Sequence, residues 1–306
     1  MSMKHILFLG TSEFAVPSLN ALIDDGRFDV IGVVTQPDRP VGRHAVVTPP
    51  PVKTLAVARD IPVFQPEKVK DLKDDATFQT LFDPRPDAFV VVSYGKILPQ
   101  WFLDLPTKGI VNVHGSLLPR WRGASPIQAA IAAGDAISGV TVMNIDAELD
   151  HGPLLATREE PILPSDTAGS LHDRLASLGG AMLPDVLDGY LAGSIHPVEQ
   201  DHAKATECRT LTRDDGNIDW TKTSEEIERL VRAYDPWPGT WTMVDGKRLK
   251  ILAARVAEPD TTKQPGEMFV RDRKPFMSCG SGTALELVTV QPEGKKPMSG
   301  ATYVSP

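Results

Sequence analysis

Apolar runs alternate with helix-like segments through the first half of the chain. The runs KHILFLG (4–10), FDVIGVVTQ (28–36), DAFVVVSYG (87–95) and GIVNVHG (109–115) are rich in Val, Ile, Leu and Phe. They show little polar alternation, which is typical of strands that are covered on both faces. Helical segments lie between them, including EFAVPSLNALIDDG (13–26) and VKTLAVARD (52–60). This alternation predicts an α/β fold with a doubly wound, mostly parallel sheet.

Capping signals predict where several helices begin and end. Thr11 or Ser12 is expected to cap the first helix. In SPIQAAIAAG, Ser125 is expected to cap the helix, Gln128 to complete a capping box and Gly134 to end the helix. A long helix is predicted within residues 167–191, and TSEEIERLVRAY (223–234) predicts a short amphipathic helix with a Thr or Ser cap.

The last third of the chain has a different pattern. Short strand-like stretches separated by turn residues, such as VDGKRLKILAARV and GTALELVTVQP, predict a small β-barrel. The preceding stretch has scattered charge and no clear period. We therefore predict a first domain over residues 1–193, a linker over 194–209 and a β-barrel domain over 210–306. A length of 306 residues agrees with about two domains.

Composition narrows the class of protein. The net charge of −8 argues against a protein that coats nucleic acid without specificity. Acidic residues outnumber basic ones in residues 1–210 but not in residues 211–306, so the last third is relatively basic. Cys208 and Cys279 stand in no metal or redox spacing. We expect neither a disulfide, a signal peptide nor a membrane span, and therefore a cytoplasmic protein.

Two polar residues interrupt the apolar strand GIVNVHG. Asn112 and His114 lie two residues apart, so their side chains are expected on the same face of the strand, near its carboxyl end. Ligands of doubly wound sheets bind beyond that end. Asp150 follows a later predicted strand, GVTVMNIDAELD. The alternative is that the polar pair only satisfies backbone groups at the end of the strand.

An amide, an imidazole and a carboxylate suit acyl transfer to an amine. Asn112 and His114 can stabilise a developing oxyanion, and Asp150 can hold the imidazole or accept a proton. The chain lacks a G-x-S-x-G motif, and neither cysteine has a catalytic setting. This combination favours direct attack by a substrate amine, without a covalent acyl-enzyme.

The stretch NVHGSLLPRWRGASPIQAAIAAGDAISGVTVMNIDAELDHG resembles the core of the folate-dependent formyltransferases. The family motif S-L-L-P-x-[YW]-R-G is present at residues 116–123, and GTSEFAVPSLNAL, VVTQPDRPVGR, VVVSYGKILP, IDW and RAYDPWPGTW also agree. The resemblance implies a Rossmann-like catalytic domain, an OB-like carboxyl-terminal domain, and catalytic roles for Asn112, His114 and Asp150. One departure is His151, where the family more often has Thr.

The resemblance also implies 10-formyltetrahydrofolate as cosubstrate, without a metal. We expect the folate to contact residues 94–98 before the polar strand, residues 116–119 in the turn after it, and the loop that leads to Asp150. The candidate residues are Tyr94, Gly95, Lys96, Ile97, Leu98, Ser116, Leu117, Leu118, Pro119, Asn144 and Asp146. For Ile97, Leu98, Leu117 and Leu118 the alternative is ordinary core packing.

The acceptor amine implied by the resemblance is that of methionyl initiator tRNA, and the alternative is an amino-sugar nucleotide. The carboxyl-terminal domain and the insertion at 36–51 favour the tRNA, and we expect a monomer. Candidate tRNA contacts are Gly10, Thr11, Ser12, Arg43, Arg120, Arg122, Lys247, Arg248, Lys250, Lys295 and Lys296. For residues 10–12 simple helix capping is the alternative. A nicotinamide-dependent oxidoreductase or a non-catalytic nucleotide-binding module is a further alternative, but the glycine fingerprint is missing.

Overall fold

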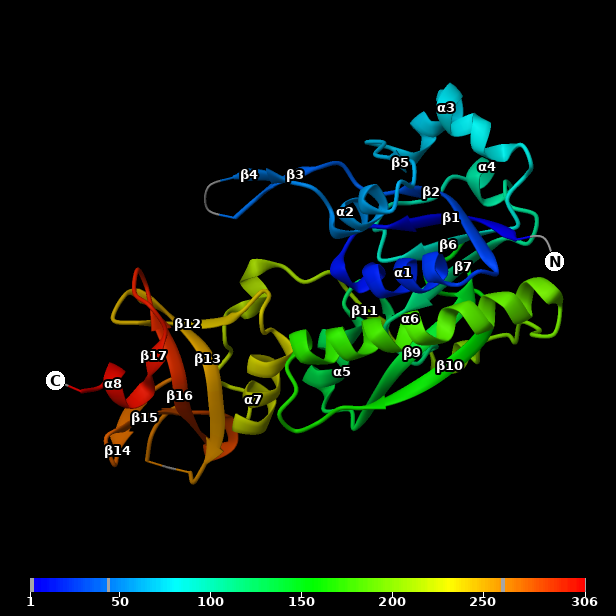
Figure 1. The fold of residues 1–306 in the computed structure, drawn as a ribbon. Helices are drawn as coiled ribbons and strands as arrows, with labels where there is room; N and C mark the ends of the chain where they lie inside the picture. The colour runs from blue at the N-terminus through cyan, green and yellow to red at the C-terminus, as the bar shows by residue number, and fades with distance from the viewer. Residues whose placement is uncertain (1–2, 43–44, 260–261, 306) are drawn as a thin grey trace. The chain divides into compact units, whose positions relative to one another are not determined.

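The computed structural model describes residues 3–42, 45–259 and 262–305. The chain forms two compact units (Figure 1). Unit 1 comprises residues 1–122, 139–160 and 172–207, and unit 2 comprises residues 123–138, 161–171 and 208–306. Residues 123–138 and 161–171 thus group with the last third of the chain. The domain limits at 193 and 210 remain a prediction.

Unit 1 is built around a seven-stranded sheet with the order β10-β9-β7-β6-β1-β2-β5. The pairs β1/β2, β1/β6, β2/β5 and β6/β7 are parallel, and β7/β9 is antiparallel. The predicted doubly wound, mostly parallel sheet is therefore confirmed. Its strands are β1 (Lys4–Gly10), β2 (Phe28–Val34), β5 (Val63–Phe64), β6 (Ala88–Val92), β7 (Ile110–His114), β9 (Ile137–Asn144) and β10 (Leu154–Pro161).

Helices and short connections cover this sheet. The helices are α1 (Val16–Asp24), α2 (Pro51–Ala58), α3 (Ala76–Gln79), α4 (Gln100–Leu103) and α6 (Ala168–Ala192). The short strands β3 (Arg39–Val41) and β4 (Val46–Thr48) form a separate hairpin, and β8 (Arg122–Gly123) pairs with β11 (Glu207–Cys208). Within the described residues, no helix is long and apolar enough to cross a membrane.

The two faces of the central strands have different neighbours. Gly179 of α6 lies close to Val113 of β7 and Val140 of β9, and the adjacent Gly180 lies against Pro17 of α1. Helices α6 and α1 therefore cover the face to which Val113 points. Because side chains alternate along a strand, Asn112 and His114 point to the opposite face.

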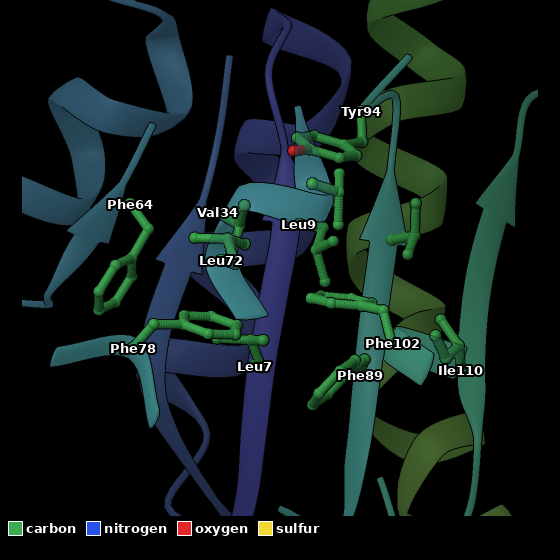
Figure 2. Close-up of a cluster of buried hydrophobic side chains, with 12 residues drawn as sticks. Leu7, Leu9, Val34, Phe64, Leu72, Phe78, Phe89, Tyr94, Phe102 and Ile110 are labelled. Carbon is green, nitrogen blue, oxygen red and sulfur yellow. The ribbon is translucent and has the colours of Figure 1, made fainter. Parts of the chain in front are cut away.

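That opposite face carries a core cluster centred on aromatic rings (Figure 2). Phe78 makes edge contacts with Phe64 and Phe82 and stacks on Phe102. All five residues of β6 are buried, as expected for a strand covered on both sides. The cluster consists of Leu7, Leu9, Val34, Phe64, Val69, Leu72, Phe78, Phe89, Val91, Tyr94, Phe102 and Ile110.

Unit 2 contains an antiparallel sheet with the order β12-β13-β16-β15-β14, to which β17 adds beside β16. The predicted short strands of the carboxyl-terminal third are thus present in an antiparallel arrangement. They are β12 (Thr240–Val244), β13 (Lys247–Ala257), β14 (Met268–Arg271), β15 (Lys274–Ser278), β16 (Ala284–Pro292) and β17 (Met298–Ser299). The helices of unit 2 are α5 (Pro126–Ala133), α7 (Ser224–Ala233) and α8 (Gly300–Tyr303).

The predicted helix caps are confirmed only in part. Thr223 caps α7 in a reciprocal box with Glu226, and Gly134 ends α5 in a left-handed conformation. The capping box predicted for Ser125 and Gln128 is wrong, because Ser125 makes no side-chain cap hydrogen bond. Ser12 occupies an N-cap position without a cap bond, because its hydroxyl donates to the hydroxyl of Ser93 instead.

The aromatic cluster gives a stability prediction. Phe78 is fully buried and contacts three other rings. We therefore expect Phe78→Ala to lower the free energy of unfolding by about 3–5 kcal/mol. The measurement is urea denaturation beside Val57→Ala, an exposed control that should change the free energy by less than about 0.5 kcal/mol. Equal stability of the two variants would contradict this assignment of the core.

Candidate active site

Three neighbouring parallel strands end together at one edge of the sheet. Gly10 of β1 lies beside Val92 of β6, and Val91 of β6 lies beside Asn112 of β7. The turns that follow β1 and β6 are joined, because the Thr11 hydroxyl donates to the Tyr94 carbonyl over 3.3 Å. This carboxyl edge is where ligands of doubly wound sheets bind.

Asn112 and His114 stand at this edge on the same strand. Asn112 is 9% exposed and His114 is 7% exposed. Throughout the part of the chain that the structure describes, no group makes a hydrogen bond to the Asn112 side chain. The amide therefore does not satisfy a backbone group at the end of the strand, the alternative weighed above. It is available to donate to a ligand atom.

A backbone carbonyl fixes the His114 ring. The Nε2 atom lies 2.9 Å from the Trp121 carbonyl oxygen. A carbonyl oxygen can only accept, so Nε2 must carry the proton in this contact. Nδ1 then faces Asp150, whose Oδ2 atom lies 3.7 Å away, beyond normal hydrogen-bond distance. The orientation of the ring thus depends on Trp121, while Asp150 supplies a nearby negative charge.

Asp150 comes from the loop between β9 and β10. The Ile145 amide donates to the Ile110 carbonyl, and Ile145 packs against the core cluster, so the loop begins beside β7. The backbone of Asp150 has a φ of 48°, in the left-handed region that non-glycine residues rarely adopt. Gln200 bonds to the carbonyls of Asp150 and Gly152. Sequence reasoning missed Gln200, which lies in the predicted linker without a periodic signal.

The turn after His114 is tied to β9. The Ser116 side chain is fully buried and donates to the Arg120 carbonyl over 2.7 Å. Thr141 of β9 donates to the Ser116 carbonyl and accepts from the Leu118 amide. Leu118 is buried, whereas Leu117 and Pro119 are partly exposed. The turn of residues 116–119 is therefore a rigid continuation of the strand that carries His114.

The residues in the segment after β6 differ in how deeply they are buried. The Tyr94 ring lies in the core cluster (Figure 2), and burial raises the pKa of its hydroxyl to about 12. Lys96 donates to the carbonyls of Pro66 and Glu67, and partial burial lowers its pKa. Leu98 packs against the core cluster, but Ile97 is 93% exposed. Core packing is therefore wrong for Ile97, and Gly95 beside it has a φ of 73°.

Asn144 and Asp146 lie at the start of the loop that carries Asp150. The Asn144 amide donates to the Tyr190 hydroxyl over 3.1 Å, and its Oδ1 atom is buried without a partner among the described residues. Asp146 accepts from the Glu148 amide and from Nδ1 of His151. Asn144 pairs with Val111 of β7 rather than with His114. The folate contacts assigned to Asn144 and Asp146 remain predictions.

The candidate tRNA contacts fall in different places. Arg120 stacks on the Trp121 ring, and Arg122 donates to Gln200 and His202. Arg43 lies outside the described residues. The remaining cations, which belong to unit 2, are Lys247, Arg248, Lys250, Lys295 and Lys296, all of them exposed. No cluster of three or more potential metal ligands occurs within residues 3–42, 45–259 and 262–305.

Comparison with known proteins identifies the family. The family model described as "Formyl transferase" matches residues 3–187, and the one described as "Formyl transferase, C-terminal domain" matches residues 210–305. The chain therefore belongs to the formyl transferase family, and the predicted family is confirmed. The family assignment excludes the alternative of a nicotinamide-dependent oxidoreductase, because members of this family transfer a formyl group.

Relatives of high identity carry one name. "Methionyl-tRNA formyltransferase" of Roseiflexus sp. (strain RS-1) is 48% identical over 98% of this chain and 91% of its own length. The protein of the same name from Pseudomonas putida (strain F1) is 46% identical over 96% of this chain and 93% of its own length.

Solved structures agree with the fold. An N-formyltransferase from Helicobacter canadensis, in complex with folinic acid and dTDP-3-aminofucose, has a TM-score of 0.69 at 17% identity and covers 95% of this chain and 100% of its own. HypX from Aquifex aeolicus, in complex with tetrahydrofolic acid, has a TM-score of 0.64 at 18% identity and covers 99% of this chain and 47% of its own.

The loop that carries Asp150 gives a prediction about Gly152. A Cβ atom on Gly152 would lie 2.1 Å from the Asn144 carbonyl oxygen. Gly152→Ala therefore forces the loop or β9 to shift, and we expect a loss of about 1–3 kcal/mol in the free energy of unfolding. Gly26→Ala is the matched control, because a Cβ there meets no atom within 4 Å. Thermal and urea denaturation of both variants make the comparison, and equal stabilities would contradict the close approach.

Proposed function

We propose that this chain transfers the formyl group of 10-formyltetrahydrofolate to the amino group of methionyl initiator tRNA and so supports translation initiation. Relatives named for that activity share 43–48% identity with it over nearly the whole chain. The observation that carries the chemistry is the arrangement of Asn112, His114 and Asp150. A buried amide without a partner and an oriented imidazole stand together at the carboxyl edge, with a carboxylate 3.7 Å from the imidazole.

Each group of this trio has a task in the reaction. The amine nitrogen attacks the formyl carbon, and negative charge develops on the formyl oxygen. The Asn112 amide donates to that oxygen, and because the side chain is held on a buried strand it needs little reorganisation. His114 stabilises the same oxygen and passes a proton, taken from the amine through Asp150, to the folate nitrogen that leaves. A new carbon–nitrogen bond thus replaces the one to the folate.

Asp150 serves the amine. An α-amino group has a pKa of about 8, so much of it is protonated near neutral pH and must lose a proton before attack. The Asp150 carboxylate accepts a proton of the amine, directly or through water, and its charge stabilises the His114 imidazolium. Because the imidazole is held by Trp121 on its other side, both functions use the same fixed geometry.

The residues around the carboxyl edge fit a folate. The exposed Ile97 offers apolar surface directly after the turn that Tyr94 and Gly95 form. The rigid turn of residues 116–119 follows the strand that carries His114. An unusually exposed aliphatic side chain in a turn that follows a central strand suits a ligand site. The assignment of the folate as cosubstrate rests on this setting and on the family, and no step of the proposed reaction uses a metal.

Unit 2 offers a surface suited to RNA, which we call the cationic face: Trp241 and Met243 of β12 with Arg248 and Lys250 of β13. Lys250 lies opposite Trp241 and Arg248 opposite Met243, so the four side chains share one side of the sheet. The Arg248 guanidinium stacks on the Trp241 ring at 3.9 Å. Leu249 and Ile251 point to the other side, into the core. Exposed cations beside an aromatic ring suit phosphate and base contacts.

Further cations lie near the cationic face. The Glu293 amide donates to the Arg248 carbonyl, and the following turn carries Lys295 and Lys296. The net negative charge of the whole chain does not argue against RNA binding by unit 2, because acidic residues do not exceed basic ones in residues 211–306. This distribution favours the tRNA over an amino-sugar nucleotide, which needs no extended basic surface. The tRNA substrate also agrees with the cytoplasmic location that the sequence predicts.

The trio is tested by formylation of methionyl initiator tRNA. We expect Asn112→Ala, His114→Ala and Asp150→Asn each to lower kcat by about 10²- to 10⁴-fold, because each removes charge stabilisation or proton transfer. Asn20→Ala, which removes a hydrogen bond to Asp24 within α1, is the control and should keep wild-type turnover. Turnover near the wild-type value in any of the three would overturn that residue's role. Product on amino-sugar nucleotides alone would overturn the proposed acceptor.

The cationic face is tested separately. We expect Arg248→Glu and Lys250→Glu to raise the KM for tRNA and leave the KM for the folate unchanged. Each should lower the slope of log affinity against log salt by about 1, because one phosphate contact is lost. Lys222→Glu makes the same charge change elsewhere in unit 2 and is the control. If all three variants bind tRNA equally well, the cationic face is not the RNA-binding surface.

A further inference from the structure

The loop that carries Asp150 is held by a side chain from a distant part of the chain. The Gln200 Nε2 atom lies 2.9 Å from the Asp150 carbonyl oxygen and 2.8 Å from the Gly152 carbonyl oxygen. Gln200 is 5% exposed. We propose that Gln200 is a positioning residue, which acts on the reaction through Asp150. The inference rests on the proposed function, because it requires Asp150 to act in formyl transfer.

The contacts allow only one orientation of the Gln200 carboxamide. Its Oε1 atom lies 3.2 Å from Nε and 2.8 Å from Nη2 of Arg122. A guanidinium can only donate, and the two loop carbonyls can only accept. The amide nitrogen must therefore face the loop and the amide oxygen must face Arg122. A neutral group with a donor end and an acceptor end is the only kind that satisfies both neighbours.

The loop needs this support because its backbone is strained at the residue that matters. Asp150 has a φ of 48°, and such conformations persist where surrounding contacts hold them. Gly152 is confined as well, because its Cα faces the Asn144 carbonyl too closely for any side chain. Gln200 binds the carbonyls on both sides of His151 and so fixes the direction in which the Asp150 side chain leaves the backbone.

Gln200 is itself anchored at both ends. The backbone of Val198 pairs with Leu154 of β10 through hydrogen bonds of 2.8 and 2.9 Å, which places Gln200 beside the end of the loop. Arg122, which holds the amide oxygen, also donates from Nη2 to Nδ1 of His202 over 2.8 Å. These anchors come from three separated stretches of unit 1, and their residues lie outside the loop of residues 145–153 that Gln200 supports.

Two stacked imidazole rings make a further contact between the Gln200 segment and the loop that carries Asp150. The His202 ring stacks on the His151 ring with a centroid distance of 4.0 Å and an interplanar angle of 5°. His151 Nδ1 lies 2.7 Å from Oδ2 of Asp146, which can only accept, so that nitrogen carries the proton. His151, which lies between the two carbonyls that Gln200 binds, is therefore also held in place through its own side chain. His151, which departs from the usual family residue, has a packing partner in His202.

Gln200→Glu is the sharpest test. The variant keeps the size of the side chain and its contact with Arg122, but it turns a carboxylate oxygen toward two carbonyl oxygens. We expect kcat for formylation of methionyl initiator tRNA to fall by about 10- to 100-fold, since a small displacement of a catalytic group has costs of this order. Both KM values should stay within about twofold, because the residue touches no substrate. A crystal structure should show the Asp150 carboxylate farther than 3.7 Å from His114.

A double variant separates positioning from a merely structural role. In the Asp150→Asn background, measured by single turnover, Gln200→Glu should have almost no further effect, because the group it positions is already lost. Gln79→Glu is the matched control. The Gln79 amide also donates to two backbone carbonyls, those of Leu72 and Lys73, but in a different part of unit 1. It should leave kcat and both KM values unchanged.

The outcomes separate the inference from the function. If the wild type formylates the tRNA and Gln200→Glu turns over equally fast, the positioning role is overturned. The same holds if the losses from Gln200→Glu and Asp150→Asn multiply. If the wild type does not formylate the tRNA, the proposed function fails, and an unmoved Asp150 in the variant crystal would overturn the positioning as well. Gln200→Met removes the same bonds without adding charge and provides the comparison if Gln200→Glu does not fold.

Discussion

The structure of unit 1 depends on one constraint, the common end of three parallel strands. Strands β1, β6 and β7 are hydrogen-bonded in register, so their last residues and the turns that follow meet at one edge. Helix α6 covers the face to which Val113 points, which leaves Asn112 and His114 on the other face. The loop after β9 passes back over that face and brings Asp150 beside His114. This edge therefore brings together the three polar side chains of the proposed active site.

Backbone carbonyls organise the proposed active site as much as side chains do. The Trp121 carbonyl decides which nitrogen of His114 carries the proton, and the carbonyls of Asp150 and Gly152 receive the amide of Gln200. Because a carbonyl oxygen can only accept, each contact fixes a protonation state or an amide orientation. Asn112 is the exception among these polar groups, since it is buried without a partner in the described part of the chain. Its donor is thus preorganised for a ligand oxygen.

In unit 2 the two sides of the antiparallel sheet have different surroundings. In an antiparallel sheet one side can pack on a core while the other meets water, and over residues 248–251 of β13 exposed and buried side chains alternate. Leu249 and Ile251 enter the core of unit 2, and Arg248 and Lys250 stand on the cationic face beside Trp241. The same alternation that stabilises the unit therefore spaces its cations along the strand.

The sequence by itself determined the strands, the family and the polar trio. Strands β6 and β7 were predictable because both of their faces are buried, and Asn112 and His114 because a strand repeats every two residues. The sequence pattern was wrong about the capping box at Ser125, whose side chain makes no cap hydrogen bond. Only the tertiary structure showed that His114 contacts the Trp121 carbonyl and that Gln200 binds the loop that carries Asp150. The contacts of these two side chains join residues up to 78 positions apart, and no local period or propensity records which distant group a side chain will meet.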